Sequence, residues 1–290
     1  MVNLKSWKAI ITKKYILITM IFFVVVVFLF SQNNFIMVNN MNLDFRDLPK
    51  GFDGFKIVQI SDLHNKMFGS NQRRLVAKIK KAQPDVIFIT GDMVDSRKYD
   101  AKPALILIDE IIDIAPIYYV TGNHEFRLAE FSFLMKEIEK RGVNVLRNSS
   151  EILEIDGDEM RIIGVDDPTT LGDMFDEEKN LAVSIDIAIG ENEEGYFDLL
   201  LSHRPEYFPI YAESQMDLTF SGHAHGGQFR LPLIGGIIAP NQGLLPKYTA
   251  GVYTEGDSKM VVSRGLGNSI IPQRIFNRPE LVVVTLYRGN

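Results

Sequence analysis

The stretch Phe55-Lys56-Ile57-Val58-Gln59-Ile60-Ser61-Asp62-Leu63-His64 decides the fold of this chain of 290 residues. Residues 55–61 form a short, mostly apolar run, as in a buried strand. Asp62 and His64 follow directly after the end of this run. Strand-like runs of this kind, each followed at once by side chains that can bind a metal, occur five times in the chain. We therefore expect an α/β fold in which strand ends assemble a metal site.

Helical stretches separate the first three of these runs. Apolar residues at helical spacing, such as Leu75, Val76 and Ile79, precede the second run, and a similar set precedes the third. Alternation of strands and helices indicates a sheet with parallel strands, and ligands bind beyond the carboxyl ends of such strands, where successive loops converge. The motifs at these three ends are Asp62-Leu63-His64, Gly91-Asp92 and Gly122-Asn123-His124-Glu125.

The second half of the chain adds two more strand ends. The runs 196–201 and 216–220 are followed by Ser202-His203-Arg204 and by Ser221-Gly222-His223-Ala224-His225. Before them, residues 151–155 and 160–165 read as short strands joined by an Asp-Gly turn, which predicts a second sheet that is partly antiparallel. The acidic segment 172–195 is expected to contain a helix whose charges form a solvated face.

All five histidines of the chain lie in these motifs. A single buried histidine is more often a hydrogen-bonded core residue than a ligand, but this concentration at strand ends favours metal binding. The chain has no cysteine, so its ligands are nitrogen and oxygen, a set that suits Mn²⁺, Fe or Zn²⁺ better than Ca²⁺ or Mg²⁺. The candidate ligands outnumber the ligands of a structural zinc site and predict two divalent metal ions with a carboxylate between them.

The N-terminal part differs from the rest of the chain. Residues 15–30 are apolar or carry hydroxyls, and residues 15–38 are long enough to cross the ~30 Å hydrocarbon core of a bilayer. A cleaved signal peptide is the alternative, but no small-X-small cleavage site follows Phe30. We expect an uncleaved transmembrane signal-anchor. The lysines of the basic tail 1–14 favour a cytoplasmic N-terminus, which predicts a single-pass protein of the cell membrane with its domain outside the cytoplasm.

The remaining residues divide into a polar linker, 39–50, and one large domain, 51–290. After residue 30 the chain carries 27 basic and 37 acidic residues, a net charge of −10. Nucleic-acid-binding surfaces normally carry a basic stripe, so a nucleic-acid partner is not expected, whereas small phosphate esters stay compatible with bound metals. The sequence indicates no particular protein partner.

In chain order, the motifs Asp-X-His, Gly-Asp, Gly-Asn-His, His and Gly-His-X-His resemble those of the calcineurin-like metallophosphoesterase superfamily over about residues 51–290. A closer resemblance, carried by Gly-Asn-His-Glu and by the eight residues from Ser221 to Gln228, is to the bacterial membrane-associated branch that includes UDP-2,3-diacylglucosamine pyrophosphatase-like proteins. The resemblance implies a four-layer α/β/β/α sandwich with two mixed sheets, preceded here by one N-terminal transmembrane helix.

The resemblance also implies a role for each motif residue. The implied metal ligands are Asp62, His64 and His225 for one ion and Asn123, His203 and His223 for the other, with Asp92 shared. His124 would be the catalytic histidine beside the scissile phosphate, where it donates a proton to the leaving oxygen or stabilises its charge. Asp95 would orient that histidine, although a helix-start cap or a surface charge is the alternative. Arg204 and Arg264 either contact phosphate or form structural ion pairs.

The implied activity is hydrolysis of a phosphomonoester, phosphodiester or pyrophosphate bond by a hydroxide that bridges the two metals, whose charges lower the pKa of the parent water. Two departures from the family pattern are Ala224, where Thr is common, and Glu125, where many relatives have Asp. Alternatives within the fold are a nuclease, against which the acidic charge counts, and an inactive metal-binding scaffold, which would be expected to lack His124 or some ligands.

The apolar segment 231–246 follows the last metal-binding motif directly. Because most apolar loop residues of a folded domain are buried, we expect these side chains to pack on the domain's own core. The alternative is that they cradle an acyl chain. Together with a membrane anchor, that alternative fits a phosphate substrate that is linked to a lipid or to the cell wall.

Overall fold

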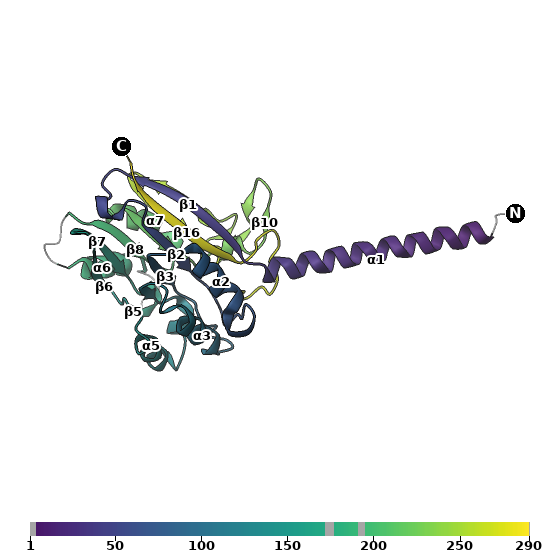
Figure 1. Cartoon of the computed structure of the whole chain (residues 1–290), viewed down its shortest axis with the longest axis horizontal. Coiled ribbons are helices and arrows are strands. Elements are labelled where there is room, and N and C mark those ends of the chain that lie inside the picture. The colour runs from purple at the N-terminus through teal and green to yellow at the C-terminus, as the bar shows by residue number, and fades with distance from the viewer. Residues whose placement is uncertain (1–3, 172–176, 191–194, 290) are drawn as a thin grey trace.

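Two six-stranded mixed sheets pack face to face in the computed structural model, which describes residues 4–171, 177–190 and 195–289 (Figure 1). The first sheet has the strand order β1 (Met37–Phe45), β16 (Glu280–Arg288), β2 (Lys56–Ile60), β3 (Val86–Thr90), β4 (Ile117–Val120) and β5 (Asn144–Val145). Neighbouring strands from β2 to β5 are parallel, as the alternation of strands and helices predicts, and β16 is antiparallel to β2.

The second sheet contains the predicted hairpin at one of its edges. Its order is β14 (Gly251–Glu255), β15 (Ser258–Val262), β9 (Leu218–Ser221), β8 (Phe197–Leu201), β7 (Asp158–Gly164) and β6 (Ser149–Ile155). The pairs at the two edges, β14 with β15 and β6 with β7, are antiparallel, while the four inner strands β7, β8, β9 and β15 run parallel to one another. The expectation of a partly antiparallel second sheet is therefore confirmed.

Helices cover the outer face of each sheet. Those on the first sheet are α2 (Arg73–Ala82), α3 (Lys102–Ile111) and α5 (Phe131–Glu139), and those on the second are α6 (Glu177–Ile189) and α7 (Phe208–Glu213). The short helix α4 (Asn123–Phe126) follows β4 directly. Helix α6 confirms the expected helix of the acidic segment, of which residues 172–176 and 191–194 lie outside the described part. The predicted four-layer arrangement is confirmed.

Alternation along the strands divides the apolar residues among three cores. In β2, Ile57 packs between the two sheets, whereas the next residue, Val58, packs beneath the helices of the first sheet. In β8, Leu199 and Leu201 join the core between the sheets while Leu200 packs under α6 and α7. Successive strand side chains point to opposite faces, so a strand buried on both faces is apolar throughout. This explains why the motif-bearing strands lack polar alternation.

The expected linker 39–50 is not a linker in its first half. Residues up to Phe45 belong to β1, which pairs in parallel with β16 along its whole length. Side chains of β1 alternate between the solvent and the protein, so that Leu43 and Phe45 are buried whereas Asn40 and Asp44 are exposed. The polar composition that suggested a linker belongs to the outer face of an edge strand.

The apolar segment 231–246 also differs from the expectation that it packs on the core. It forms two very short hairpins, β10 (Arg230–Leu231) with β11 (Gly235–Gly236) and β12 (Ile238–Ala239) with β13 (Gly243–Leu244). Leu233, Ile234, Leu244 and Leu245 are exposed, while Ala239 is buried. A hairpin with two paired residues on each side leaves its turn outside any core, which is why these side chains stay at the surface.

Helix α1 (Leu4–Asn34) projects away from the sandwich as a single long rod (Figure 1). Its segment Thr12–Asn34 is long and apolar enough to cross a membrane. The helix ends at Asn34, so the predicted span of 15–38 is too long at its C-terminal end, and Met37 and Val38 are the first residues of β1. Only Phe35 and Ile36 separate the helix from the sheet.

The place of β1 in the core yields a stability test. Phe45 packs edge-to-face on Phe197, with ring centroids 5.0 Å apart. Phe45→Ala should lower the free energy of unfolding by about 3–5 kcal/mol, because it opens a cavity between the sheets. The exposed Asn40→Ala on the same strand should change it by less than about 0.5 kcal/mol. Chemical denaturation of the detergent-solubilised protein measures both values, and equal effects would contradict the assignment of β1 to the core.

Candidate metal centre

The five motifs meet at one end of the sandwich, where the carboxyl ends of strands from both sheets come together. Strands β2, β3 and β4 are parallel neighbours in the first sheet, and β8 and β9 are parallel neighbours in the second, so the loops that follow them converge. Gln59 links the two sheets at this end. Its amide nitrogen donates to Thr90 Oγ1 of β3 at 3.0 Å and to the carbonyl of Ser221 of β9 at 2.9 Å.

Three of the expected ligands, Asp62, His64 and His225, form a buried cluster. His64 Nε2 lies 3.2 Å from His225 Nε2, and His225 Nε2 lies 3.4 Å from Asp62 Oδ1. Two atoms that bind one cation at about 2.0–2.2 Å are roughly 3 Å apart. The three donor atoms therefore have the spacing of ligands around a single ion.

A second buried cluster consists of Asp92, His203 and His223. His203 Nε2 lies 3.3 Å from Asp92 Oδ2 and 3.2 Å from His223 Nδ1. The same oxygen of Asp92 is 3.5 Å from His64 Nε2 of the first cluster. Because one carboxylate oxygen faces both clusters, Asp92 has the position of a ligand shared by two cations.

Asn123 provides a separate indication of a cation. Its carbonyl oxygen Oδ1 is buried and has no hydrogen-bond partner among the described residues. A buried amide oxygen without a partner costs about 1–3 kcal/mol of stability, and a cation beside it would remove this cost. The Asn123 side chain lines the same cavity as Asp92 and His223. The donor set of carboxylate, imidazole and amide oxygen thus fits two divalent ions.

Hydrogen bonds set which nitrogen of each imidazole points into the site. His203 Nδ1 lies 2.7 Å from the carbonyl of Thr90 and donates to it, so Nε2 is the nitrogen that faces Asp92. His223 is turned the other way, because its Nε2 lies 3.3 Å from Asn241 Oδ1 and Nδ1 faces His203. Metal-binding histidines commonly donate their second nitrogen to an oxygen in this manner.

The charges of the two clusters require a positive partner. Burial raises the pKa of Asp62 to about 6, and the nearby Asp92 also raises it. Burial lowers the pKa of His64 to about 4, so its imidazole is neutral and able to bind a metal near neutral pH. Burial opposes protonation of His203 too, but Asp92 and Asp62 outweigh it and raise its pKa to about 10. The two buried carboxylates thus attract positive charge, which bound metal ions would supply.

The backbone at the site adopts an unfavourable conformation. Asp62, His64, Asp92, His223 and His225 all have positive φ, between 44° and 63°. Such a left-handed conformation in a residue other than glycine costs of order 1–3 kcal/mol and is found most often at functional sites. Here the five residues all belong to the two clusters described above.

His124 lies against His64 of the first cluster, with ring centroids 4.6 Å apart, and is held by Ser96. The backbone N–H of Ser96 donates to His124 Nδ1 at 3.0 Å, and the Ser96 hydroxyl lies 3.1 Å from the same nitrogen. Nδ1 is therefore the acceptor, which puts the proton of the neutral ring on Nε2. Asp95 Oδ1 is farther away, at 3.8 Å, and accepts from the backbone N–H of Arg97 instead. The expected orienting role of Asp95 stays a prediction, and Ser96 was not foreseen.

Glu125, noted in the sequence only as a departure from the family pattern, joins the ends of two strands. Its carboxylate accepts hydrogen bonds from the backbone N–H groups of Asp92, Met93 and Gly122, at 2.8–2.9 Å. Burial raises the pKa of Glu125 to about 7, and Asp92 raises it further. Through these bonds Glu125 fixes the loop that carries the shared carboxylate.

Two glycines allow these loops to approach closely. A Cβ on Gly91, whose φ is +87°, would lie 2.5 Å from the backbone nitrogen of Gly122. A Cβ on Gly122 would lie 2.3 Å from Asp92 Oδ1. The Gly-Asp and Gly-Asn-His motifs therefore need glycine at both positions, because a larger residue would displace Asp92.

The site opens into a cavity of about 320 Å³ that Asn123, His124, His223, Arg97 and Arg127 help to line. The two arginines place positive charge at the wall of this cavity. Sequence reasoning missed both, since nothing in the sequence distinguishes them from surface arginines. Arg204 instead forms a bidentate ion pair with the buried Asp167, at 2.7 and 3.0 Å, as the structural alternative for that residue predicts.

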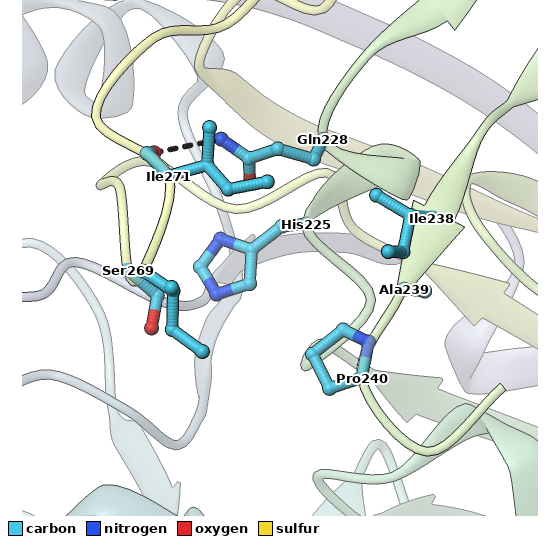
Figure 2. Close-up of a pocket in the computed structure, with 8 residues that line it drawn as sticks. His225, Gln228, Ile238, Ala239, Pro240, Ser269 and Ile271 are labelled. Atoms are coloured by element: carbon cyan, nitrogen blue, oxygen red, sulfur yellow. Dashed lines mark hydrogen bonds between the residues drawn. The ribbon is translucent and has the colours of Figure 1, made fainter. Parts of the chain in front are cut away.

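A second, largely apolar cavity of about 240 Å³ adjoins the first (Figure 2). Figure 2 shows the His225 ring between the strand that carries Ile238 and Ala239 and the loop that carries Ser269 and Ile271. The amide of Gln228 holds that loop by donating to the carbonyl of Ile271 at 2.8 Å. The residues common to both cavities are His225, Pro240, Ser269 and Ile270.

Arg274 is a further residue that the sequence did not reveal. It is fully buried and donates to the carbonyls of Gly267 and Arg264, and one of its nitrogens lies 3.5 Å from His225 Nδ1. Burial lowers its pKa to about 10, against the opposing effect of Asp62. A lone arginine in a loop has no sequence signal that predicts burial.

Comparisons with known proteins agree with this geometry. Residues 55–227 match the model of the calcineurin-like phosphoesterase family. The chain is 34% identical over 252 residues to the uncharacterized metallophosphoesterase YkuE of Bacillus subtilis, covering 84% of this chain and 82% of that protein. It is 27% identical to phosphodiesterase YaeI of Escherichia coli, over 80% and 82% of the two chains.

A third relative is a transmembrane protein with metallophosphoesterase domain from Danio rerio, 27% identical over 86% of this chain and 57% of that protein. The family model covers more than half of the present chain, and YkuE is similar along most of it. On this evidence the chain belongs to the calcineurin-like phosphoesterase family, whose members use divalent metal ions.

Proposed function

We propose that this protein is a phosphoester hydrolase with two divalent metal ions, Mn, Fe or Zn, in its active site. One ion would be held by Asp62, His64 and His225, the other by Asn123, His203 and His223, with Asp92 between them. The observation that carries the proposal is the single oxygen of Asp92 that faces both clusters, 3.5 Å from His64 Nε2 and 3.3 Å from His203 Nε2.

The bound ions would supply a hydroxide nucleophile at neutral pH and offset the charge of the phosphate. The chain's own residues do the rest. Arg97 and Arg127, at the wall of the cavity, bind the outer phosphate oxygens. His124 carries its ring proton on Nε2, since Ser96 donates to Nδ1, and so it donates this proton to the leaving oxygen.

The apolar cavity beside His225 supports a substrate whose phosphate carries an apolar group. A phosphate between the two clusters would leave one substituent next to Ile238 and Ile270. Such a cavity favours a hydrocarbon chain over a sugar or a nucleobase, because it offers few polar partners. We infer a lipid- or cell-wall-linked phosphodiester, phosphomonoester or pyrophosphate as substrate. The printed name of YaeI, a phosphodiesterase, supports the first of these bond types.

We also propose that α1 anchors the protein in the cell membrane with the hydrolase domain outside the cytoplasm. The length and apolar character of the helix support the anchor, as does the transmembrane relative. The lysines before the apolar run, Lys5, Lys8, Lys13 and Lys14, support the orientation, since basic residues flanking a span tend to stay in the cytoplasm.

The proposal is tested first by metal analysis of the full-length protein in detergent. We expect about two Mn, Fe or Zn ions per chain, as a shared carboxylate requires. Hydrolysis of a chromogenic phosphodiester or phosphomonoester should stop when a chelator removes the metals and return when Mn²⁺ is added. A protein that holds no metal under these conditions would refute the proposal, whereas metal without hydrolysis would point to a more demanding substrate, such as a lipid pyrophosphate, or to the scaffold alternative.

Two substitutions separate metal binding from proton donation. His124→Ala should lower turnover by about 10²- to 10⁴-fold while the metal content stays at the wild-type level, because the imidazole acts on the leaving group. Asp92→Ala should lose metal, and with it activity, because both ions depend on this carboxylate. Elemental analysis and initial rates on the same preparations measure both effects. A His124→Ala protein as active as wild type would remove the role assigned to this residue.

The topology is tested by reporter fusions after Asn290. An alkaline phosphatase reporter, which is active only outside the cytoplasm, should be active there, whereas a green fluorescent reporter should be dark. Fusions after Lys14, before the apolar run, should give the opposite pair of results. A fluorescent signal after Asn290 would overturn the orientation without touching the proposed chemistry.

A further inference from the structure

The face of the domain from which α1 leaves contains no spacer between helix and domain. The apolar run of α1 extends to Phe30, yet Phe28 already contacts Phe276 of the domain, with ring centroids 5.3 Å apart. The amide of Gln273 also donates to the carbonyl of Leu29 at 3.1 Å. If residues up to Phe30 lie in hydrocarbon, the part of the domain around residue 276 lies at the membrane surface.

Hydrogen bonds fix the direction in which α1 leaves. The backbone N–H of Arg274 donates to Asn33 Oδ1 at 2.9 Å, and Asn33 Nδ2 donates to the carbonyl of Pro272 at 2.8 Å. One residue earlier, Gln32 Oε1 accepts from the backbone N–H of Asn277 at 3.2 Å. The helix is therefore part of the folded domain, and the plane of the membrane has a defined orientation relative to the metal centre.

Exposed apolar side chains gather on this face. Figure 1 places the hairpin of β10 beside the base of α1, and the backbone N–H of Arg230 in β10 donates to the carbonyl of Ile275 at 3.0 Å, next to Phe276. The second hairpin follows at once, because only Ile237 separates β11 from β12. We call the exposed residues of this region the apolar rim: Leu231, Leu233, Ile234, Leu244, Leu245 and Ile270.

Basic side chains lie on the same face, beside the last residues of α1. A hollow next to Asn34, Phe35 and Ile36 is lined by four cationic residues, Arg74, Lys78, Lys81 and Arg278, and by no acidic residue of the described chain. The chain after residue 30 has a net charge of −10, so this concentration of positive charge runs against its overall character. Cations beside a membrane helix attract anionic lipid headgroups.

We propose that this face docks on the lipid bilayer, with the apolar rim inserted at the boundary of headgroups and acyl chains and the four-cation hollow against anionic headgroups. The proposal rests on the membrane anchor inferred above, which brings the bilayer to this face. Groups of exposed apolar side chains mark contact surfaces, and those of interfacial segments enter the boundary layer to a depth of about 5–10 Å. Here no second protein is needed to cover the rim.

Docking has a consequence for the apolar cavity. Ile270 belongs both to the rim and to the cavity wall, and Ile238 of the second hairpin lines the cavity as well. With the rim inserted, the cavity opens at the level of the lipid headgroups. An amphiphilic phosphoester then reaches the metal centre sideways from the membrane, without passing through water.

The test measures tryptophan fluorescence of the full-length protein in nanodiscs that contain lipids brominated near the headgroup end of their chains. The chain has one tryptophan, Trp7, so Trp7→Phe provides a silent background. Into it we place Ile234→Trp in the rim or, as the matched control, Ile187→Trp in α6 on the opposite side of the domain (Figure 1). The two isoleucines are equally exposed, at 61% and 62%. A third variant, Phe22→Trp, reports on α1 itself.

The proposal predicts that brominated lipid reduces the emission of Trp at 234 by about half or more while the emission of Trp at 187 does not change, because quenching requires contact with the acyl chains. Strong quenching at 22 without quenching at 234 would overturn docking and leave the anchor in place. No quenching at 22 would overturn the anchor, and docking with it. None of these readings depends on metal or turnover, so the result stands whether or not the proposed hydrolase activity is found.

Discussion

Two buried carboxylates, Asp62 and Asp92, at the meeting point of the two sheets are the constraint on which the site depends. Like charges repel each other strongly in a site without water. Each carboxylate therefore favours its neutral, protonated form unless a cation lies beside it. The imidazoles of His64, His203, His223 and His225 surround the pair, and the carbonyl oxygen of Asn123 has no hydrogen-bond partner among the described residues. The fold tolerates this concentration of polar groups because metal ions would complete it.

The strained backbone at the ligands has the same origin. Five of the expected ligand residues adopt positive φ, and Gly91 and Gly122 bring their strands so close that no side chain fits between them. Glu125 and Gln59 then hold the loops through hydrogen bonds to backbone groups and across the two sheets. Strands buried on both faces supply the free energy that keeps these loops in place. The strands form a rigid scaffold, and the loops at their ends carry the residues of the candidate site.

Much of this arrangement can be predicted from the sequence because strand ends are marked in it. A buried strand is a short apolar run, and the first Asp, Asn or His after such a run lies at the edge of a sheet, so the positions of Asp62, Asp92, Asn123, His203 and His223 follow from simple rules. The resemblance to a family then assigns each of them an ion. These rules locate positions along the backbone and do not predict contacts between side chains.

The remainder depends on contacts between distant residues. Ser96 holds His124, Arg274 approaches His225 from a late loop, and Arg97 and Arg127 reach the cavity, yet each looks like an ordinary surface residue in the sequence. Strand β1 escaped prediction because an edge strand shows only half of its residues to the core, and its polar half resembles a linker. For the two short hairpins the sequence predicted burial, but their leucines and isoleucines are exposed because no core lies beside them.

The two-residue connection between α1 and β1 also makes the protein sensitive to the thickness of its membrane. The run 15–30, whose residues are apolar or carry hydroxyls, spans about 24 Å as a helix, less than the ~30 Å of an average hydrocarbon core. On the proposed anchoring, this hydrophobic mismatch is relieved by local thinning of the bilayer or by drawing the domain inward. Because only two residues join α1 to β1, no flexible hinge between helix and sheet can compensate for this displacement. Lipid composition would thus set the height of the metal centre above the bilayer midplane.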